Sequence, residues 1–358
     1  MAEVETDSGA KAESQGNARP YAPSWVDRFT DWVDRRPGLS WLYYLGLGVV
    51  MLLVQAIVLW IEGTSPLGNF GIAQVYLVAV IAYMLALIHY LDKRAGVALE
   101  TMRPALKAVD EEYQEMFYRL TTLPAFPTLL ASLAALAFVI LTEAIGEPYR
   151  LEVLAPFPIS ANLLRIFYLI CWMVFGVFLY HTLHQLRVIN HIYTKHTRID
   201  LFRVKPLYAF SNLAALTAGS LAMISYGWLL VNPWLDRTDP LVLTPMFILL
   251  LFAVVTFVWP QMGIHRLQVA EKERLLDEAS QRFKAAIREL HKKMDDRELE
   301  GMTDLNMAMA SLEIELNALR KTATWPWEPE VLQLLITALA LPLGLWLIQL
   351  ILQRTLSP

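Results

Sequence analysis

Long apolar runs separated by polar stretches dominate the pattern of this chain. Each run is apolar over about 20 residues, the length that an α-helix needs to cross the hydrocarbon core of a bilayer. The seven runs lie at residues 40–61, 71–91, 126–146, 162–186, 207–231, 242–265 and 331–353. The sequence therefore predicts an all-α polytopic membrane protein with seven transmembrane helices.

The polar stretch after the second run, residues 92–122, carries an apolar stripe of its own. Its apolar residues recur at spacings of three and four, as they do on one face of an amphipathic helix. They are Ala95, Ala98, Met102, Leu106, Val109, Tyr113, Met116 and Leu120. Pro104 marks a start or a kink within this helix. We expect residues 92–122 to extend the membrane domain as helix rather than as loop.

Residues 266–323 predict a helical hairpin. A helix over about 268–294 and a second over about 303–321 both carry heptad-like stripes, and a short polar turn separates them. The stripes are Leu276, Ala279, Phe283, Ala286, Leu290 and Met294, then Leu305, Met309, Leu312, Leu316 and Leu319. Residues 187–205 predict a further overrun of the fourth membrane helix. Together these extensions predict one helical bundle continuous with the membrane domain of residues 37–358.

The N-terminal region divides in two. Residues 1–23 are polar and poor in large aliphatic side chains, which predicts a disordered tail, and they lack the apolar core of a signal peptide. Residues 24–36 predict a short helix in the membrane interface, with Ser24 as its N-cap. The face of this helix that would meet the membrane carries Trp25, Phe29, Trp32 and Val33.

The distribution of basic residues predicts the orientation. Of the 30 Lys and Arg residues, 26 lie before the first run or in the connections after the second, fourth and sixth runs. Basic residues near helix ends stay on the cytoplasmic side. We therefore expect a cytoplasmic N-terminus, a C-terminus outside, a cytoplasmic helical bundle, and a location in the plasma membrane, or in the inner membrane of a bacterium.

Composition agrees with a membrane protein and narrows the chemistry. Hydrophobic residues make up 56% of the chain and charged residues only 18%. No metalloprotease, phosphate-loop or nucleophile-elbow motif is present, so we expect no enzyme and no cofactor. The single cysteine, Cys171, excludes an intramolecular disulfide. Expected partners are the lipid bilayer, further copies of this chain and a small-molecule ligand of unknown identity, and not nucleic acid.

Three histidines near the end of the fourth run form the first candidate site. His181, His184 and His191 fall within about 80° of one another at 100° per residue, so they share one helical face. They could bind a metal or sense pH, which would suit a membrane enzyme. The alternative is that they are solvated, or bonded to the backbone, where the helix leaves the membrane.

A second candidate site lies where the third run ends and the fourth begins, on the side of the membrane opposite to the histidines. Glu143 and Arg165 are predicted at similar depth, as an interfacial ion pair or as polar groups of a ligand pocket open to the outside. Aromatic side chains on neighbouring helices would line such a pocket, or serve only as packing and interfacial residues. They are Tyr168, Trp172, Tyr226 and Trp228.

The hairpin returns to the membrane at Trp325, Pro326 and Trp327, directly before the last run. The two indoles can anchor at the interface, and the proline ends one helix before the next begins. We expect this coupling turn to join the last membrane helix mechanically to the hairpin. Acidic and basic residues are scarce inside the runs, which argues against an ion-coupled transporter but not against a channel.

The predicted architecture resembles the seven-transmembrane ion channel superfamily of insect odorant and gustatory receptors. The last run contains "PLGLWLIQL", residues 342–350, where Gln349 takes the place of the glutamine in that family's motif of Thr-Tyr, five hydrophobic residues and Gln-Phe. Pro342, Leu343 and Leu350 depart from this motif. Gln349 alone therefore carries the match.

The resemblance implies a ligand-gated or otherwise stimulus-gated cation channel. It implies a tetramer whose pore is lined by residues 331–353, with Gln349, Gln353 and Trp346 as pore or gate candidates. The two amides could instead simply reach the membrane interface. A non-conducting receptor or scaffold that signals through its cytoplasmic helices is the alternative function, and a membrane enzyme that uses the histidines is a further one.

Overall fold

A computed structural model of the chain describes most of its residues. They are residues 19–63, 65–145, 157–201, 205–231, 240–297, 300–327, 329–333 and 335–340, together with 344 and 348. Within these ranges the secondary structure is helical, and strand-like pairing is limited to two isolated bridges, Pro23 with Pro124 and Leu106 with Thr197.

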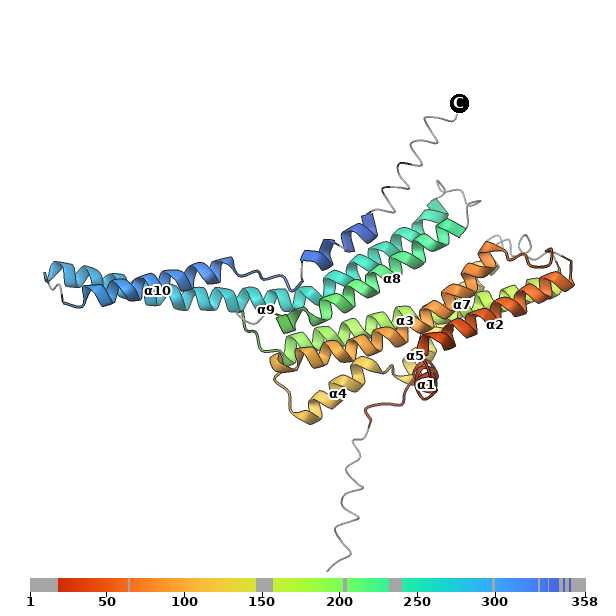
Figure 1. Ribbon diagram of the computed structural model, residues 1–358, viewed down its shortest axis with the longest axis horizontal. Coiled ribbons are helices and arrows are strands. Elements are labelled where there is room, and N and C mark those ends of the chain that lie inside the picture. Colours follow the sequence, from red (N-terminus) through yellow and green to blue (C-terminus); the bar gives the residue numbers. More distant parts are fainter. Residues whose placement is uncertain are drawn as a thin grey trace, which may run out of the picture.

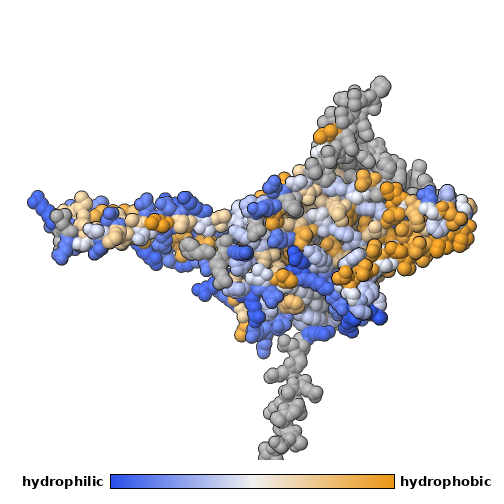
Figure 2. Space-filling model, in the orientation of Figure 1, coloured by the Kyte–Doolittle hydropathy of each residue, from blue (hydrophilic) through white to orange (hydrophobic). Residues whose placement is uncertain are grey.

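Six helices among the described residues are long and apolar enough to cross a membrane. They are α2 (Ser40–Ile61), α3 (Ile72–Met102), α5 (Ala125–Ile145), α7 (Pro158–His191), α8 (Ala209–Val231) and α9 (Pro240–Asp295). Apolar surface gathers at one end of the molecule, where α2 and α7 lie (Figures 1 and 2). The first six predicted runs thus correspond to helices, and the seventh stays a prediction because much of 331–353 lies outside the described residues.

Close helix packing in the membrane domain depends on small side chains. A Cβ added to Gly176 of α7 would lie 2.5 Å from the Cβ of Ala135 and 2.8 Å from the backbone oxygen of Ala131, both on α5. Without a hydrophobic driving force between helices in lipid, close backbone approach of this kind supplies packing energy. Gly176 therefore lets α5 and α7 form one of the tightest pairs of the fold.

Two helices, α3 and α7, continue well beyond the predicted spans. α3 runs to Met102, and α7 runs to His191 and then into a π-helical turn, η2 (Ile192–His196). The ends of these two overruns are joined by backbone hydrogen bonds, from Lys107 N to His196 O (2.6 Å) and from Arg198 N to Ala105 O (2.7 Å). The predicted overrun through 187–205 is helical as far as His196, and Thr197 after it is extended.

The predicted helix of residues 92–122 forms as three pieces. After α3 comes a short 3-10 turn that contains Pro104, η1 (Arg103–Ala105), and α4 (Asp110–Thr121) follows. The stripe residues Met102, Tyr113, Met116 and Leu120 are buried as predicted, whereas Val109 is 70% exposed. Val109 leaves the stripe because it precedes the first turn of α4 and lies between two helices rather than inside one.

The first helix, α1 (Trp25–Asp34), begins at Ser24 with a capping box. That Trp25, Phe29, Trp32 and Val33 face the membrane stays a prediction, and protein contacts bury a partly different set of residues. The buried residues are Val26, Asp27, Thr30 and Val33, and Trp32 is 46% exposed. α1 packs against α2, α3 and α5, so protein contacts select its buried face. Asp27 and Thr30 become buried for this reason.

The longest helix, α9, has 56 residues and so extends about 84 Å. α10 (Met302–Lys321) returns along it as a hairpin that projects away from the other helices (Figure 1). Within the described part of the hairpin, the fully buried apolar residues lie near its base, where Leu316 and Leu319 meet Ala279 and its neighbours. Short helical segments over 329–333 and 335–340 follow the hairpin, and a smaller helix, η3 (Lys205–Tyr208), precedes α8.

Candidate functional site

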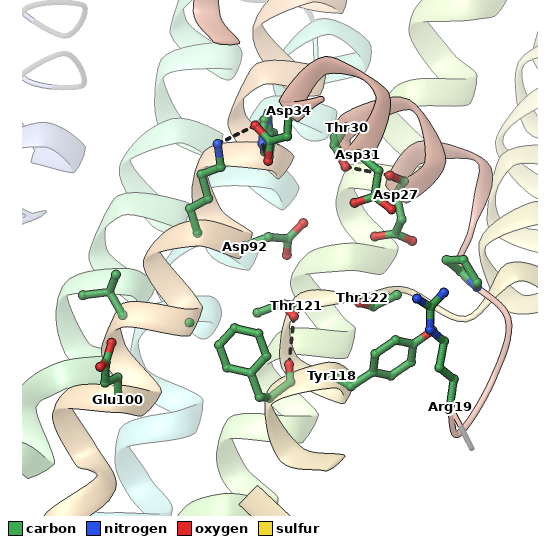
Figure 3. A pocket seen from close by; sticks show the side chains of 16 residues that line it. Arg19, Asp27, Thr30, Asp31, Asp34, Asp92, Glu100, Tyr118, Thr121 and Thr122 are labelled. Carbon is green, nitrogen blue, oxygen red and sulfur yellow. Dashed lines mark hydrogen bonds and ion pairs between the residues drawn. The ribbon is translucent and has the colours of Figure 1, made fainter. Parts of the chain in front are cut away.

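A polar cavity of about 580 Å³ lies beside α1 (Figure 3). Its walls come from residues 19–34, from the end of α3 and from the end of α4. Five carboxyl groups line it: Asp27, Asp31, Asp34, Asp92 and Glu100. Two fixed positive charges, Arg19 and Lys93, and the imidazole of His89 line it as well. The cavity is therefore acidic in balance.

A chain of hydrogen bonds fastens the end of α1 to α3 and α2. Asp34 accepts from Lys93 Nζ at 2.7 Å and from His89 Nε2 at 2.9 Å. With Nε2 donating, Nδ1 of a neutral His89 ring accepts from the hydroxyl of Tyr44, 2.8 Å away. Burial favours a higher pKa of Asp34, but the bonds from Lys93 and His89 outweigh it and lower the pKa below its ordinary value.

A second group of bonds fastens α3 to α7. Oδ1 of Asp92 accepts from His181 Nε2 at 2.8 Å and from Gln185 Nε2 at 3.0 Å. The side chain of His181 is wholly buried and that of Asp92 is 13% exposed. A buried carboxylate is costly unless it is paired and hydrogen-bonded, and His181 and Gln185 satisfy this condition. The pair therefore fixes the register of α3 against α7.

Asp27 forms the third group, at the start of α1. Its Oδ2 accepts from Ser24 N (3.0 Å), Ser24 Oγ (2.6 Å) and Leu123 N (3.1 Å), which ties α1 to the junction between α4 and α5. The residue is only 5% exposed. Burial raises the pKa of Asp27 to about 6, with the bonds from Ser24 opposing the rise and the nearby Asp92 adding to it.

These groups give the cavity a defined chemical character. Carboxylates from α1 and α3 face a shared space in which burial and mutual repulsion favour a bound positive charge or a proton. Among the described residues, no group of three or more His, Cys, Asp or Glu side chains is arranged to hold a metal ion. The carboxylates of the cavity are suited to cations that bind through hydrogen bonds and charge.

The three predicted histidines have separate partners. His181 bonds to Asp92, as described above, and His184 donates from Nε2 to the backbone oxygen of Arg119 at 2.8 Å. The ring of His191 lies 5.4 Å from that of His196. Their shared helical face therefore contacts two different helices, α3 and α4, and the structure does not gather the three rings around one point.

The predicted pocket residues at the other end of the membrane helices fall into separate clusters. The ring of Tyr168 packs against Trp172 at 6.3 Å, and that of Trp228 against Tyr76 at the same distance. The Tyr226 hydroxyl donates to the backbone oxygen of Leu339 at 2.7 Å. Arg165 is exposed and engaged in contacts of its own, whereas the side chain of Glu143 lies outside the described residues.

The coupling turn lies along α9. Trp325 stacks on His265 with ring centroids 3.8 Å apart and planes 8° apart, and on Trp327 at 4.4 Å. Trp327 continues the stack to Phe257 at 5.5 Å. Pro326, which lies between the two tryptophans in sequence, is buried. His265 Nδ1 also donates to the backbone oxygen of Thr324 at 2.9 Å. The turn is thus held to α9 by an unbroken row of four rings.

The predicted pore or gate residues Trp346, Gln349 and Gln353 lie outside the described residues. The structure therefore leaves these predictions as they stand.

The acidic cavity is the feature that sequence reasoning missed. Two local signals pointed to it: the Ser24 and Asp27 spacing of a capping box, and His89, Asp92 and Lys93 clustered where an apolar run ends. Neither signal indicates that α1 folds back against α3.

Comparison with protein-family models, with curated proteins and with solved structures finds no match for this chain.

Proposed function

We propose that the chain is the subunit of a tetrameric, ligand-gated or otherwise stimulus-gated cation channel with seven membrane spans. In this proposal the N-terminus and the α9–α10 hairpin are cytoplasmic, the C-terminus is outside, and residues 331–353 line the pore. The resemblance to the seven-transmembrane channels of insect odorant and gustatory receptors belongs to the same proposal.

The observation that carries the proposal is the division of the last element. The chain ends α10 at Lys321, passes the stacked coupling turn, and begins a new apolar helix at Pro329. This helix packs on one side only, since Leu335 is 4% exposed and Ile336 is 55% exposed. A membrane helix that leaves one side uncovered can line a pore or meet a neighbouring subunit.

The uncovered side of this segment also contains polar groups. Gln333 and Thr337 are exposed and lie four residues apart, so they share a helical face. Amide and hydroxyl groups along an otherwise apolar span suit a pore wall, where water and dipoles stabilise a hydrated ion.

Exposed apolar side chains along the hairpin provide a second support for assembly. Met294, Met307 and Ile314 are 60%, 58% and 71% exposed. Exposed apolar side chains on two long helices need cover from lipid or from another protein. Hairpins of neighbouring subunits would supply that cover. Contacts between them would also fix the position of the hairpin to which the coupling turn is joined.

Particle imaging of the purified protein in nanodiscs tests the proposal. We expect a four-fold particle with residues 331–353 around the central axis and the hairpins in contact. A monomer, or a two-fold dimer without an axial pore, would contradict it. This measurement requires no stimulus, whereas silence in a current recording could reflect only a missing one.

A non-conducting receptor is the second candidate, and the acidic cavity favours it. The cavity lies where α1, α3, α4 and α7 are joined, so occupancy could alter how these helices pack without any pore. A receptor of this kind would show ligand-dependent changes in hydrogen exchange of the hairpin while vesicles containing the protein stay impermeable to potassium. Potassium flux through such vesicles would rule out this candidate.

A further inference from the structure

We propose that the acidic cavity beside α1 binds a small organic ammonium ion, a protonated amine that carries an apolar group. The proposal does not depend on whether the chain conducts ions, because it concerns binding alone.

The first support is a pair of carboxylate oxygens turned into the cavity (Figure 3). All three hydrogen bonds to Asp27 reach Oδ2, and within the described part of the chain none reaches its Oδ1. Asp27 is 95% buried by its neighbours, so Oδ1 has only the cavity to face. In Asp92, likewise, the hydrogen bonds from His181 and Gln185 both reach Oδ1, and Oδ2 faces the same cavity. An ammonium group donates hydrogen bonds and can satisfy both oxygens at once.

The second support is the charge balance of the lining. Five carboxyl groups face two fixed bases, and one of these, Lys93, already pairs with Asp34. Within the described ranges, Asp31 and Glu100 make no salt bridge. Unpaired carboxylates around a confined space attract cations and repel anions. The lining therefore favours a positively charged ligand over phosphate-bearing or carboxylate-bearing compounds.

The third support is the size and the wall of the cavity. A volume of about 580 Å³ is typical of small-molecule sites and far exceeds the needs of a bare metal ion. Val97 and the ring of Phe117 line it and are 54% and 39% exposed. A Cβ at Gly96 would lie 3.0 Å from the Phe117 ring, so the ring rests directly on the backbone of α3. This wall suits the apolar part of an amine.

The geometry also links binding to the fold. Asp27 belongs to α1 and Asp92 to α3, and Asp92 is bonded onward to α7 through His181. An ammonium group that bridges the two carboxylates ties α1 to the α3–α7 pair. The bridge screens the repulsion between the two carboxylates and stabilises this arrangement.

The test uses the full chain in nanodiscs and phenethylammonium as the probe, with binding measured by calorimetry at pH 7.5. We expect saturable binding that weakens at least tenfold in Asp27→Asn, which removes the charge but keeps an oxygen acceptor. Val97→Trp fills the cavity without touching a carboxylate and should weaken binding to a similar degree. Asp110→Asn removes an exposed carboxylate that pairs with Arg103 outside the cavity and should leave binding unchanged.

Two further probes sharpen the result. Potassium and magnesium chloride at equal ionic strength should fail to displace phenethylammonium. If the probe were held only by non-specific charge attraction, both salts would displace it. The proposal is overturned if no saturable binding occurs, if either salt displaces the probe, or if Asp27→Asn and Val97→Trp both bind as the parent chain does. Should Asp27→Asn fail to fold, Val97→Trp alone decides the outcome.

Discussion

The corner around α1 and the α9–α10 hairpin are built in opposite ways. The corner buries charged groups and satisfies them with partners on other helices, as His181 does for Asp92. The hairpin keeps its charges on the surface, for example in the Arg274 and Glu271 pair, and, in its described part, fully buries apolar residues only near its base. Buried pairs are costly to break, whereas exposed pairs contribute little. The corner should therefore define the fold, and the hairpin should depend on what covers it.

The largest effect is expected from breaking the buried pair in the corner. His181→Ala leaves the Asp92 carboxylate buried without its main partner, and the free energy of unfolding should fall by about 3–5 kcal/mol. Thermal unfolding in detergent measures the loss. Glu278→Ala, which removes an exposed partner of Arg274 in the hairpin, serves as the control and should cost less than about 1 kcal/mol. Equal losses would contradict the comparison.

A cavity at the base of the hairpin should have a local effect. Leu319 is 1% exposed, and Leu319→Ala should weaken packing between α9 and α10 by about 2–3 kcal/mol. We expect faster hydrogen exchange throughout 275–321 and an unchanged unfolding temperature for the membrane helices. Faster exchange in α3 and α7 as well would show that the hairpin and the corner unfold together.

The stability of the corner should depend on pH through Asp27. Its folded pKa of about 6 exceeds that of an exposed aspartate, so the folded state holds the proton more tightly than the unfolded state. This contribution is fully present below about pH 4 and is lost as the pH rises through 6. The stability of the parent chain relative to Asp27→Asn should therefore decrease from pH 4 to pH 7, by roughly 2–3 kcal/mol in the free energy of unfolding. Unfolding temperatures of the two chains, measured at each pH, follow this change.

The ionisable side chains of Asp92, Asp31, Asp34 and His89 line the same cavity, which is why the difference between the two chains is the quantity to measure. A difference that stays constant across this range would show that Asp27 keeps an ordinary pKa.

The smallest effect is expected where the two regions meet. Trp325→Ala removes an inner ring of the stack on α9, and the loss of stacking should cost about 0.5–1.5 kcal/mol beyond the buried area. If the chain is a channel, this variant and Trp327→Ala should alter gating while assembly stays intact, and current recording of assembled variants measures this. Unchanged conduction in both would remove the coupling role from the turn. Trp32→Ala, at an exposed tryptophan of α1, is the control.

The sequence predicted the positions of the helices more accurately than it predicted the residues of the site. The first six apolar runs are helical, and α10 lies within a residue of the predicted return helix. Val109 lies outside the covered stripe, and the side of α1 that packs against protein was not predicted, because neighbouring helices decide which side of a short amphipathic helix is covered. The cavity was not predicted, although its residues are conspicuous once placed together.

What the sequence alone determined is what contiguous residues can encode. An apolar run of about 20 residues becomes a membrane-length helix, and a stripe at spacings of three and four becomes an amphipathic one, since both depend on local periodicity. Tertiary structure alone decided that Asp34 meets His89, 55 residues away, and that Asp92 meets His181, 89 residues away. A buried carboxylate is stable only beside its partners, and those partners come together only when separate helices pack.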